Sequence, residues 1–254
     1  MAVDDLSLAA ELVRGAGELA ASMLRDGLRT EHKTSVSDVV SAADHAAEEL
    51  IVARLRSERP GDGIVGEEGT SDPGDGRTWY VDPVDGTYNF LSGLQVWCAA
   101  LALADPGKAP LGAVYQPSAG ELWLGGPHAA TTCNGRPVQA LADRALREVS
   151  LATYLHPTTL PDDSLRRPLL RVLERAATVR MLGSGSVELA AIAGGRLGVS
   201  VQADSLPWDW LPGAALVVAA GGAAEIVETD GHRWHVAGNR RAVRDVAELL
   251  TCGS

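Results

Sequence analysis

Hydrophobic residues in the first half of the chain follow a helical period at first and a strand period later. Apolar residues at helical spacing predict one helix over residues 6–24 and a second over about 41–56. Further along, the pattern predicts a short strand, a longer strand with both faces buried, and a hairpin whose loop is residues 116–120. These strands are expected at residues 78–81, 96–104, 111–115 and 121–124.

The second half alternates between the two periods. We expect strands at residues 149–155, 178–182, 197–201 and 224–227, and helices at residues 162–175, 186–193, 212–220 and 241–250. Alternation of this kind is typical of α/β folds. The chain is therefore predicted to be an α/β protein in which an α+β half, residues 1–145, is joined to an α/β half, residues 146–254. The seam is expected within residues 141–148.

Composition and charge narrow the classes of function. The 254 residues are 46% hydrophobic, and no apolar run approaches the roughly 18 residues that cross a bilayer. A formal net charge of −11 disfavours nucleic acid as a partner. The acidic N-terminus differs from a basic secretory signal, and Cys98, Cys133 and Cys252 fit neither a disulfide framework nor a zinc site. We therefore expect a cytoplasmic protein with neither a nucleic-acid nor a membrane partner.

Candidate chemistry begins where the strand at residues 78–81 runs into an acidic turn. Asp82 and Asp85 are three residues apart across a proline turn, so both carboxylates can point toward one ion, and the Val84 carbonyl can join them. Gly86 and Thr87 follow with free backbone N–H groups that can seat a phosphate oxygen. The alternative is an aspartate-rich turn in which Asp85 caps the next segment.

Two further acidic residues can also be interpreted either as ion ligands or as ordinary surface or capping residues. Glu67 lies between glycines at residues 66–69, where adjacent acids are usually solvated. Asp209 lies between two tryptophans, and one hypothesis is that it N-caps a helix beginning near Pro212. A carboxylate ahead of a buried apolar helix nevertheless suggests a positively charged partner.

Taken together, these groups favour a hard cation. Carboxylates with a main-chain carbonyl, and without clustered histidine or cysteine, suit Mg²⁺ before Ca²⁺ or Zn²⁺. His232 and His235 are expected to be surface or packing residues. Ser184 and Ser186 do not form the nucleophile elbow of a serine hydrolase, and the chain contains neither a phosphate-binding P-loop nor a dinucleotide fingerprint.

Four segments, in this order, carry a resemblance to a known family. They are residues 37–44 (SDVVSAAD), 66–69 (GEEG), 79–90 (WYVDPVDGTYNF), and Trp208-Asp209 leading to residues 219–222 (AAGG). The sequence resembles the inositol monophosphatase family of Mg²⁺-dependent, lithium-sensitive phosphatases. The resemblance implies a layered αβαβα sandwich and a homodimer.

The resemblance also implies roles for individual residues. Glu67, Asp82, Asp85 and Asp209, with the Val84 carbonyl, match the metal ligands of the family. Thr87 matches the hydroxyl that orients the attacking water together with Glu67. Asp44 matches a carboxylate in the water network of that site, although its spacing equally suits a capping-box partner of Ser41.

On the substrate side, Gly86 and Thr87 match the N–H donors to the phosphate. Lys33 matches a lysine near the phosphate and metal, although it can equally be an exposed loop lysine. Sugar hydroxyls in the family meet positions that correspond to Asp85, Asp209, Gly183, Ser184, Gly185 and Gln202. Gln202 replaces an acidic residue and cannot pair with an ammonium group, which favours inositol phosphate over histidinol phosphate.

The implied reaction is direct attack of a metal-activated water on a phosphomonoester, with two or three Mg²⁺ ions and no covalent intermediate. The short stretch between Glu68 and Trp79 favours a small ester, and myo-inositol 1-phosphate is the predicted substrate. One alternative is a phosphatase for histidinol phosphate or another small sugar phosphate. A second alternative is a non-catalytic regulator that retains the fold.

Overall fold

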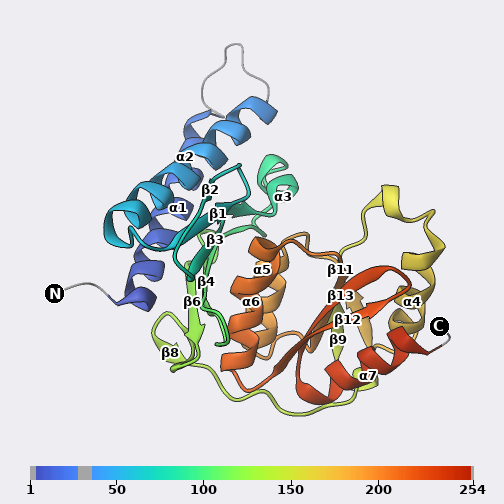
Figure 1. The fold of residues 1–254 in the computed structure, drawn as a ribbon. Coiled ribbons are helices and arrows are strands. Elements are labelled where there is room, and N and C mark those ends of the chain that lie inside the picture. Colours follow the sequence, from blue (N-terminus) through green and yellow to red (C-terminus); the bar gives the residue numbers. More distant parts are fainter. Residues whose placement is uncertain (1–3, 28–35, 253–254) are drawn as a thin grey trace.

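The computed structural model describes residues 4–27 and 36–252, which form two β-sheets that alternate with three helical layers (Figure 1). The predicted layered α/β architecture is confirmed. Within the described residues, no helix is both long enough and apolar enough to span a membrane.

The first sheet follows two long helices, α1 (Asp5–Gly27) and α2 (Val36–Glu58). Its strands are β1 (Gly63–Gly66), β2 (Ser71–Asp72), β3 (Thr78–Asp85), β4 (Cys98–Ala104), β5 (Leu111–Gln116), β6 (Glu121–Gly126), β7 (Ala129–Cys133) and β8 (Arg136–Pro137). Their order is β2-β1-β3-β4-β5-β6-β7-β8, and every neighbouring pair is antiparallel except β1 and β3. A short helix, α3 (Thr87–Leu91), lies between β3 and β4.

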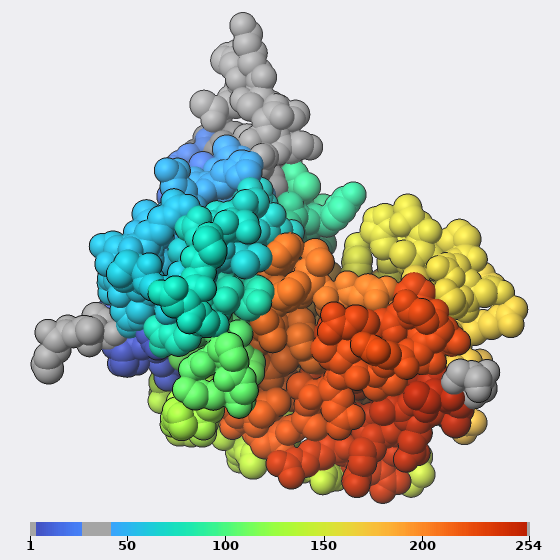
Figure 2. Space-filling view, viewed as in Figure 1, coloured from blue at the N-terminus to red at the C-terminus, as the bar shows by residue number. Residues whose placement is uncertain are grey.

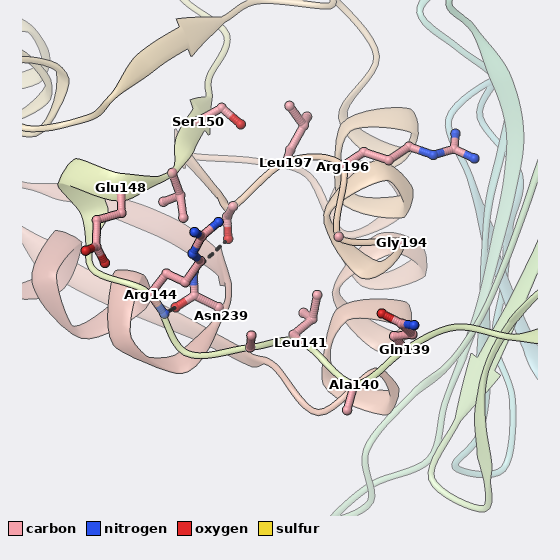
Figure 3. Close-up of a pocket in the computed structure, with 14 residues that line it drawn as sticks. Gln139, Ala140, Leu141, Arg144, Glu148, Ser150, Gly194, Arg196, Leu197 and Asn239 are labelled. Carbon is pink, nitrogen blue, oxygen red and sulfur yellow. Dashed lines mark hydrogen bonds between the residues drawn. The ribbon is translucent and has the colours of Figure 1, made fainter.

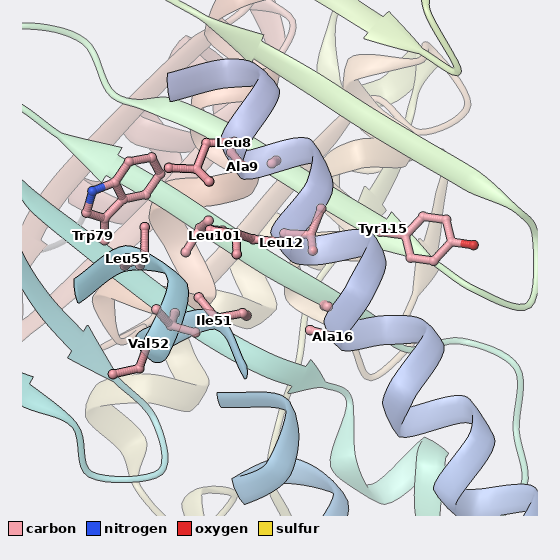
Figure 4. Close-up of a cluster of buried hydrophobic side chains, with 14 of the residues drawn as sticks. Leu8, Ala9, Leu12, Ala16, Ile51, Val52, Leu55, Trp79, Leu101 and Tyr115 are labelled. Carbon is pink, nitrogen blue, oxygen red and sulfur yellow. The ribbon is translucent and has the colours of Figure 1, made fainter. Parts of the chain in front are cut away.

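The helices α1 and α2 cover one face of this sheet, as their apolar stripes predict. Leu8 and Leu12 of α1 pack with Ile51 of α2 against Trp79 and Leu101 of the sheet (Figure 4). Gly17 allows α1 to approach β5 closely, because a Cβ there would lie 2.8 Å from the Tyr115 ring. Burial of this stripe is the main reason that the two helices are stable.

The second sheet contains both parallel and antiparallel pairs. Its strands are β9 (Ser150–Ala152), β10 (Thr178–Arg180), β11 (Val199–Ala203), β12 (Ala223–Thr229) and β13 (His232–Gly238), in the order β10-β9-β11-β13-β12. The helices of this half are α4 (Asp163–Leu173), α5 (Gly185–Ala193), α6 (Pro207–Ala219) and α7 (Arg240–Thr251). The pairs β9–β10 and β9–β11 are parallel, and the others are antiparallel.

The middle layer, α5 and α6, lies between the two sheets (Figure 1). Its apolar cluster includes Val114 and Trp123 from the first sheet and Ala237 from the second. The neighbouring residue Val236 packs on the opposite face with α4 and α7, as expected for alternating strand positions. The two halves therefore share a core, and the division at residue 145 stays a prediction.

Some predicted boundaries are wrong. α2 begins at Val36 rather than near Ser41, and β1, β7 and the short helix α3 were not predicted. α6 begins at Pro207 rather than Pro212. Both prolines suit the first turn of a helix, but Pro207 occupies it, so Pro212 lies inside the helix.

The seam between the halves contains a cavity of about 400 Å³ (Figure 3). Arg144, Glu148, Arg196 and Asn239 line it together with the glycine-rich turn after α5. Arg196 is paired with Glu121, and none of the predicted site residues lines this cavity. Its volume therefore does not mark the reaction site.

Candidate active site

β3 brings two aspartates to one side of the first sheet by means of a bulge. In a regular strand, residues three apart point to opposite faces. Opposite β4, however, Asp82 pairs with Ala100 and Asp85 with Cys98, so three steps along β3 match two steps along β4. The bulge turns both carboxylates toward one place, which their spacing in the sequence does not by itself determine.

Asp209 joins them from α6. It lies in the first turn of that helix, where the N-terminal N–H groups favour negative charge. One carboxylate oxygen from each of Asp82, Asp85 and Asp209 lies within 4.8 Å of the others. The hypothesis that Asp209 caps a helix near Pro212 is wrong, because the helix begins at Pro207. We call these three aspartates the aspartate cluster.

The cluster holds its charges out of water. Asp82 is 1% exposed, and burial raises the pKa of Asp82 well above its ordinary value, with further increases from the neighbouring carboxylates. Burial, together with the charges of Asp85 and Glu67, raises the pKa of Asp209 to about 7. Desolvation and like-charge repulsion thus both oppose ionisation of the metal-free cluster.

The donor set fits a hard divalent cation. Asp82 Oδ1 accepts a hydrogen bond from Val84 N at 3.1 Å, whereas buried Asp82 Oδ2 has no hydrogen-bond partner in the described part of the chain. Carboxylate and carbonyl oxygens are the ligands that Mg²⁺ prefers. A cation would give the orphaned oxygen the positive partner that it lacks.

Asp85 connects the two halves of the molecule. Gly185 N and Ser186 N, at the start of α5, donate hydrogen bonds to its carboxylate at 3.2 and 2.5 Å. Burial nevertheless raises the pKa of Asp85, against the effect of these bonds. Ser184 caps α5 through its hydroxyl, which accepts from Val187 N. The predicted glycine-rich segment, residues 183–185, is therefore brought to the cluster.

The backbone after Asp85 is tightly constrained. Gly86 has φ +99°, a conformation that L-residues rarely adopt, and it precedes α3. A Cβ at Gly86 would lie 3.0 Å from Val96 O and 3.1 Å from Gly183 O. The next residue, Thr87, donates its hydroxyl hydrogen to Val84 O at 3.3 Å. Only glycine fits here without strain.

Glu67 approaches from β1, whose end is fastened by a residue that the sequence analysis missed. Glu48 of α2 is 4% exposed, and its carboxylate accepts hydrogen bonds from Glu68 N at 2.9 Å, Thr70 N at 3.2 Å and Thr70 Oγ1 at 2.6 Å. Glu67 N donates to Val81 O of β3 at 3.1 Å. The sequence contains a signal for this role, because Glu48 is a charged residue directly after Ala47, which is on the predicted inward face of the helix.

Asp44 lies one helical turn before Glu48. It is 5% exposed, and burial, with the charges of Glu68 and Glu67, raises the pKa of Asp44 to about 7. Glu67 is more exposed than the aspartates, but partial desolvation by the surrounding protein still raises the pKa of Glu67. The capping-box alternative for Asp44 is wrong, because α2 starts at Val36 and Ser41 is inside it. Lys33 lies outside the described residues.

A second missed carboxylate supports the glycine-rich segment. Glu188 of α5 is 2% exposed, and its Oε1 accepts a hydrogen bond from Leu182 N at 2.7 Å. Burial raises the pKa of Glu188 to about 8. Asn89 donates from Nδ2 to Leu182 O and to Val96 O, both at 2.7 Å. These contacts hold the turn before residues 183–185.

Gln202 is placed differently from the other predicted residues. It lies on β11, opposite His235 of β13, and lines a cavity of about 170 Å³ beside α4. None of the three aspartates lines this cavity. His235 is buried and packs edge-on against Trp210, which agrees with its predicted role as a packing residue.

The sequence is similar to a known family of proteins and to individual members of it. The model of the inositol monophosphatase family matches residues 3–248. Inositol monophosphatase 3 of Solanum lycopersicum is 32% identical over 225 residues, which are 85% of this chain and 84% of that protein. A histidinol-phosphatase of Chlorobaculum parvum is 34% identical over 221 residues, 86% of this chain and 84% of that protein.

Solved structures agree on the fold. Inositol monophosphatase II of Staphylococcus aureus superposes with a TM-score of 0.83 at 24% identity, covering 96% of this chain and 95% of that chain. The extragenic suppressor protein suhB of Bartonella henselae gives a TM-score of 0.80 at 26% identity, covering 97% and 99%. The resemblance predicted from the four sequence segments is confirmed. The chain belongs to the inositol monophosphatase family of metal-dependent phosphatases, which are hydrolases of phosphoric monoesters.

Proposed function

We propose that the protein hydrolyses myo-inositol 1-phosphate to inositol and phosphate in a Mg²⁺-dependent reaction. The observation that carries this proposal is the aspartate cluster, in which one carboxylate oxygen from each residue lies within 4.8 Å of the others and Asp82 Oδ2 has no hydrogen-bond partner among the described residues. Such a cluster is costly for a protein that only binds a neutral partner. It is useful to one that handles cations and phosphate.

In this proposal, Glu67, Asp82, Asp85, Asp209 and the Val84 carbonyl hold two or three Mg²⁺ ions. Bound cations would neutralise the charge of the phosphate and lower the pKa of a water molecule. Asp44 accepts hydrogen bonds from the surrounding waters. The requirement for Mg²⁺ is expected to be in the millimolar range, because the ion stays largely hydrated when few carboxylates hold it.

The chain's own groups position the reactants. Thr87 gives its hydroxyl hydrogen to Val84 O, so the lone pairs of Thr87 Oγ1 are free to accept a hydrogen bond from the attacking water. Glu67 accepts the second hydrogen of that water. The water oxygen bonds to phosphorus as the ester P–O bond breaks. One hydrogen of that water stays on the new phosphate oxygen, and the other passes to the departing alkoxide. The N–H groups of Gly86 and Thr87 bind phosphate oxygens.

The substrate hydroxyls are assigned to Asp85, Asp209, Gly183, Ser184, Gly185 and Gln202, with Lys33 near the phosphate. A second candidate substrate is histidinol phosphate. The histidinol-phosphatase of Chlorobaculum parvum, 34% identical to this chain, supports that alternative. Inositol 1-phosphate is preferred because Gln202 offers no negative charge to an ammonium group.

The first prediction concerns activity. We expect Mg²⁺-dependent phosphate release from inositol 1-phosphate to exceed release from histidinol phosphate and from a panel of sugar phosphates. Asp82→Asn should lower kcat/KM more than about 100-fold, because it removes a ligand rather than a supporting group. Asp143→Asn is the matched control, since it removes one charge at an exposed position and should leave activity unchanged. Equal activity of Asp82→Asn and wild type would contradict the proposed site.

A second prediction concerns metal removal. Mg²⁺ at about ten times its dissociation constant should stabilise the protein by about 1.4 kcal/mol and raise Tm by roughly 3–6 °C relative to EDTA. In EDTA, Asp82→Asn should melt at or above the wild-type temperature, because one of the buried carboxyl groups that disfavour one another's ionisation is gone. Thermal unfolding with both proteins checks this. A wild type indifferent to Mg²⁺ would instead favour the non-catalytic regulator.

A third prediction concerns Glu48. Glu48→Gln retains the shape but places an NH₂ group against backbone donors, so the loop bearing Glu67 loosens. We expect kcat/KM to fall about 10- to 100-fold and the Mg²⁺ concentration for half-maximal activity to rise. The neighbouring Glu49 is exposed, and Glu49→Gln should behave as wild type. An unchanged Mg²⁺ requirement of the Glu48→Gln protein would contradict the prediction that Glu48 supports the metal-binding loop.

We also propose that the protein is a cytoplasmic homodimer. β10 is an edge strand of the second sheet, and the apolar side chains of Val179 and Met181 are exposed beside it, 36% and 53% respectively. Such an edge can pair with a second copy. The three cysteines are unpaired, which suits a reducing compartment.

The fourth prediction follows from this edge. The mass of one chain is 26.5 kDa, and sedimentation analysis should give twice this mass. Val179→Lys should shift the equilibrium toward the monomer, because it places a charge in the interface. Leu170→Lys, at an exposed apolar position on α4, is the control and should remain dimeric. A monomeric wild type at micromolar concentration would contradict the proposal.

A further inference from the structure

The cavity at the seam between the two halves, which we call the seam cavity, has no residue of the aspartate cluster in its walls. The walls come from the segment at residues 139–150, from the turn at residues 194–198 and from Asn239 at the start of α7. Figure 2 shows the yellow-green atoms of the segment that joins the halves at the surface, along the lower edge of the molecule. The volume of about 400 Å³ is within the range of roughly 300–1,000 Å³ that is typical of small-molecule sites.

Arg144 brings a positive charge to the seam cavity. The residue is exposed, and Figure 3 shows its guanidinium group directed into the cavity. Within residues 4–27 and 36–252, this guanidinium group has neither an ion pair nor a hydrogen bond. A guanidinium group carries five N–H donors, and two of them can bind a carboxylate or a phosphate side by side. Arg144 is therefore accessible to an anion.

A buried asparagine holds the backbone of Arg144 in place. Asn239 is 4% exposed, and its Oδ1 accepts hydrogen bonds from Arg144 N at 3.1 Å and from Ala242 N at 3.0 Å. The backbone N–H of Asn239 donates in turn to Gly198 O at 3.1 Å. The base of the Arg144 side chain is thus fixed relative to α7 and to the start of β11. Such preorganisation lowers the entropy that is lost when a ligand binds.

The other charged side chains that line the seam cavity have partners of their own. Arg196 forms an ion pair with Glu121 at 2.6 Å, and Glu148 Oε2 accepts a hydrogen bond from Ala145 N at 3.0 Å. Figure 3 shows the charged ends of Arg196 and Glu148 directed away from the cavity. In the described part of the chain, the side chains that line the cavity therefore leave the charge of Arg144 unneutralised. This local positive charge attracts anions, although the formal net charge of the chain is −11.

The remaining walls combine apolar surface with polar groups. Leu141 and Leu197 are partly buried and line the cavity, so they offer apolar surface to a ligand. The amide of Gln139 and the hydroxyl of Ser150 also line it, and neither has a hydrogen-bond partner among the described residues. A ligand in the cavity thus meets apolar surface beside groups that can donate or accept hydrogen bonds.

We propose that the seam cavity is a binding site for a small organic anion, separate from the reaction site. A carboxylate or phosphate group of this ligand accepts hydrogen bonds from the guanidinium group of Arg144. Its carbon skeleton packs against Leu141 and Leu197. The assignment does not depend on the proposed phosphatase function, because the aspartate cluster takes no part in it.

The test is the thermal unfolding of the full chain in EDTA, titrated with glutarate or with inorganic phosphate against NaCl of equal ionic strength. EDTA removes divalent cations, so the acidic cluster has no cation through which to bind an anion. Both probes should raise Tm of the wild type beyond the effect of NaCl. Arg144→Gln should weaken the Kd of the probes at least about tenfold, because a hydrogen-bonded charge pair is lost. Arg175→Gln is the matched control, since Arg175 is exposed and does not line the cavity.

The two probes also identify the acidic group of the ligand. A response of the wild type to glutarate alone, lost in Arg144→Gln, indicates a carboxylate, and a response to phosphate alone indicates a phosphorylated ligand. Equal affinity of Arg144→Gln and wild type for both probes would overturn the proposal, because the anions would then bind elsewhere. A wild type that neither probe stabilises beyond NaCl would overturn it as well. Because the measurement requires no turnover, its outcome is independent of whether the protein hydrolyses inositol 1-phosphate.

Discussion

Repulsion among buried carboxylates is the constraint on which the rest of this site depends. Asp82, Asp85 and Asp209 come from a strand bulge and from the first turn of a helix, so the backbone fixes their positions before any ligand arrives. Charges held this way cannot relax by turning toward solvent. The elements around the cluster must therefore resist its tendency to open.

The buried carboxylates of the structure differ in how far backbone donors compensate them. Glu48 and Glu188 are as buried as the aspartates, but each accepts hydrogen bonds from backbone N–H groups of a neighbouring loop. Asp82 Oδ2 has no such donor in the described part of the chain, and its neighbours are other acids. Burial alone therefore does not mark a candidate metal ligand. Asp82 differs from Glu48 and Glu188 because one of its buried oxygens has no compensating donor among the described residues.

Much of the site was predictable because its information is local. Asp82, Val84, Asp85, Gly86 and Thr87 lie within six consecutive residues, and hydrophobic periods that extend over whole helices predict the mixed α/β class. The layered arrangement was predicted from the family resemblance. Features that depend on distant contacts were missed or misplaced.

Three examples show what the sequence could not supply. The role of Glu48 requires a loop twenty residues away, and the bulge of β3 requires the register of β4. The start of α6 was misplaced because two prolines five residues apart, Pro207 and Pro212, compete for the same helical position. Local pattern cannot rank such alternatives, since packing of α6 between the sheets decides between them.

The middle layer explains why neither sheet could form the site alone. Asp85 belongs to the first sheet, but its hydrogen bonds come from the start of α5, and Asp209 comes from the start of α6. Gly86 meets the carbonyl of Gly183 so closely that a Cβ would have no room. The apolar cluster of α5 and α6 with both sheets stabilises this junction, while the aspartates destabilise it. Hydrophobic burial in the middle layer thus offsets the cost of holding three acids together, and the same junction connects the end of β11 to the helix that carries Asp209.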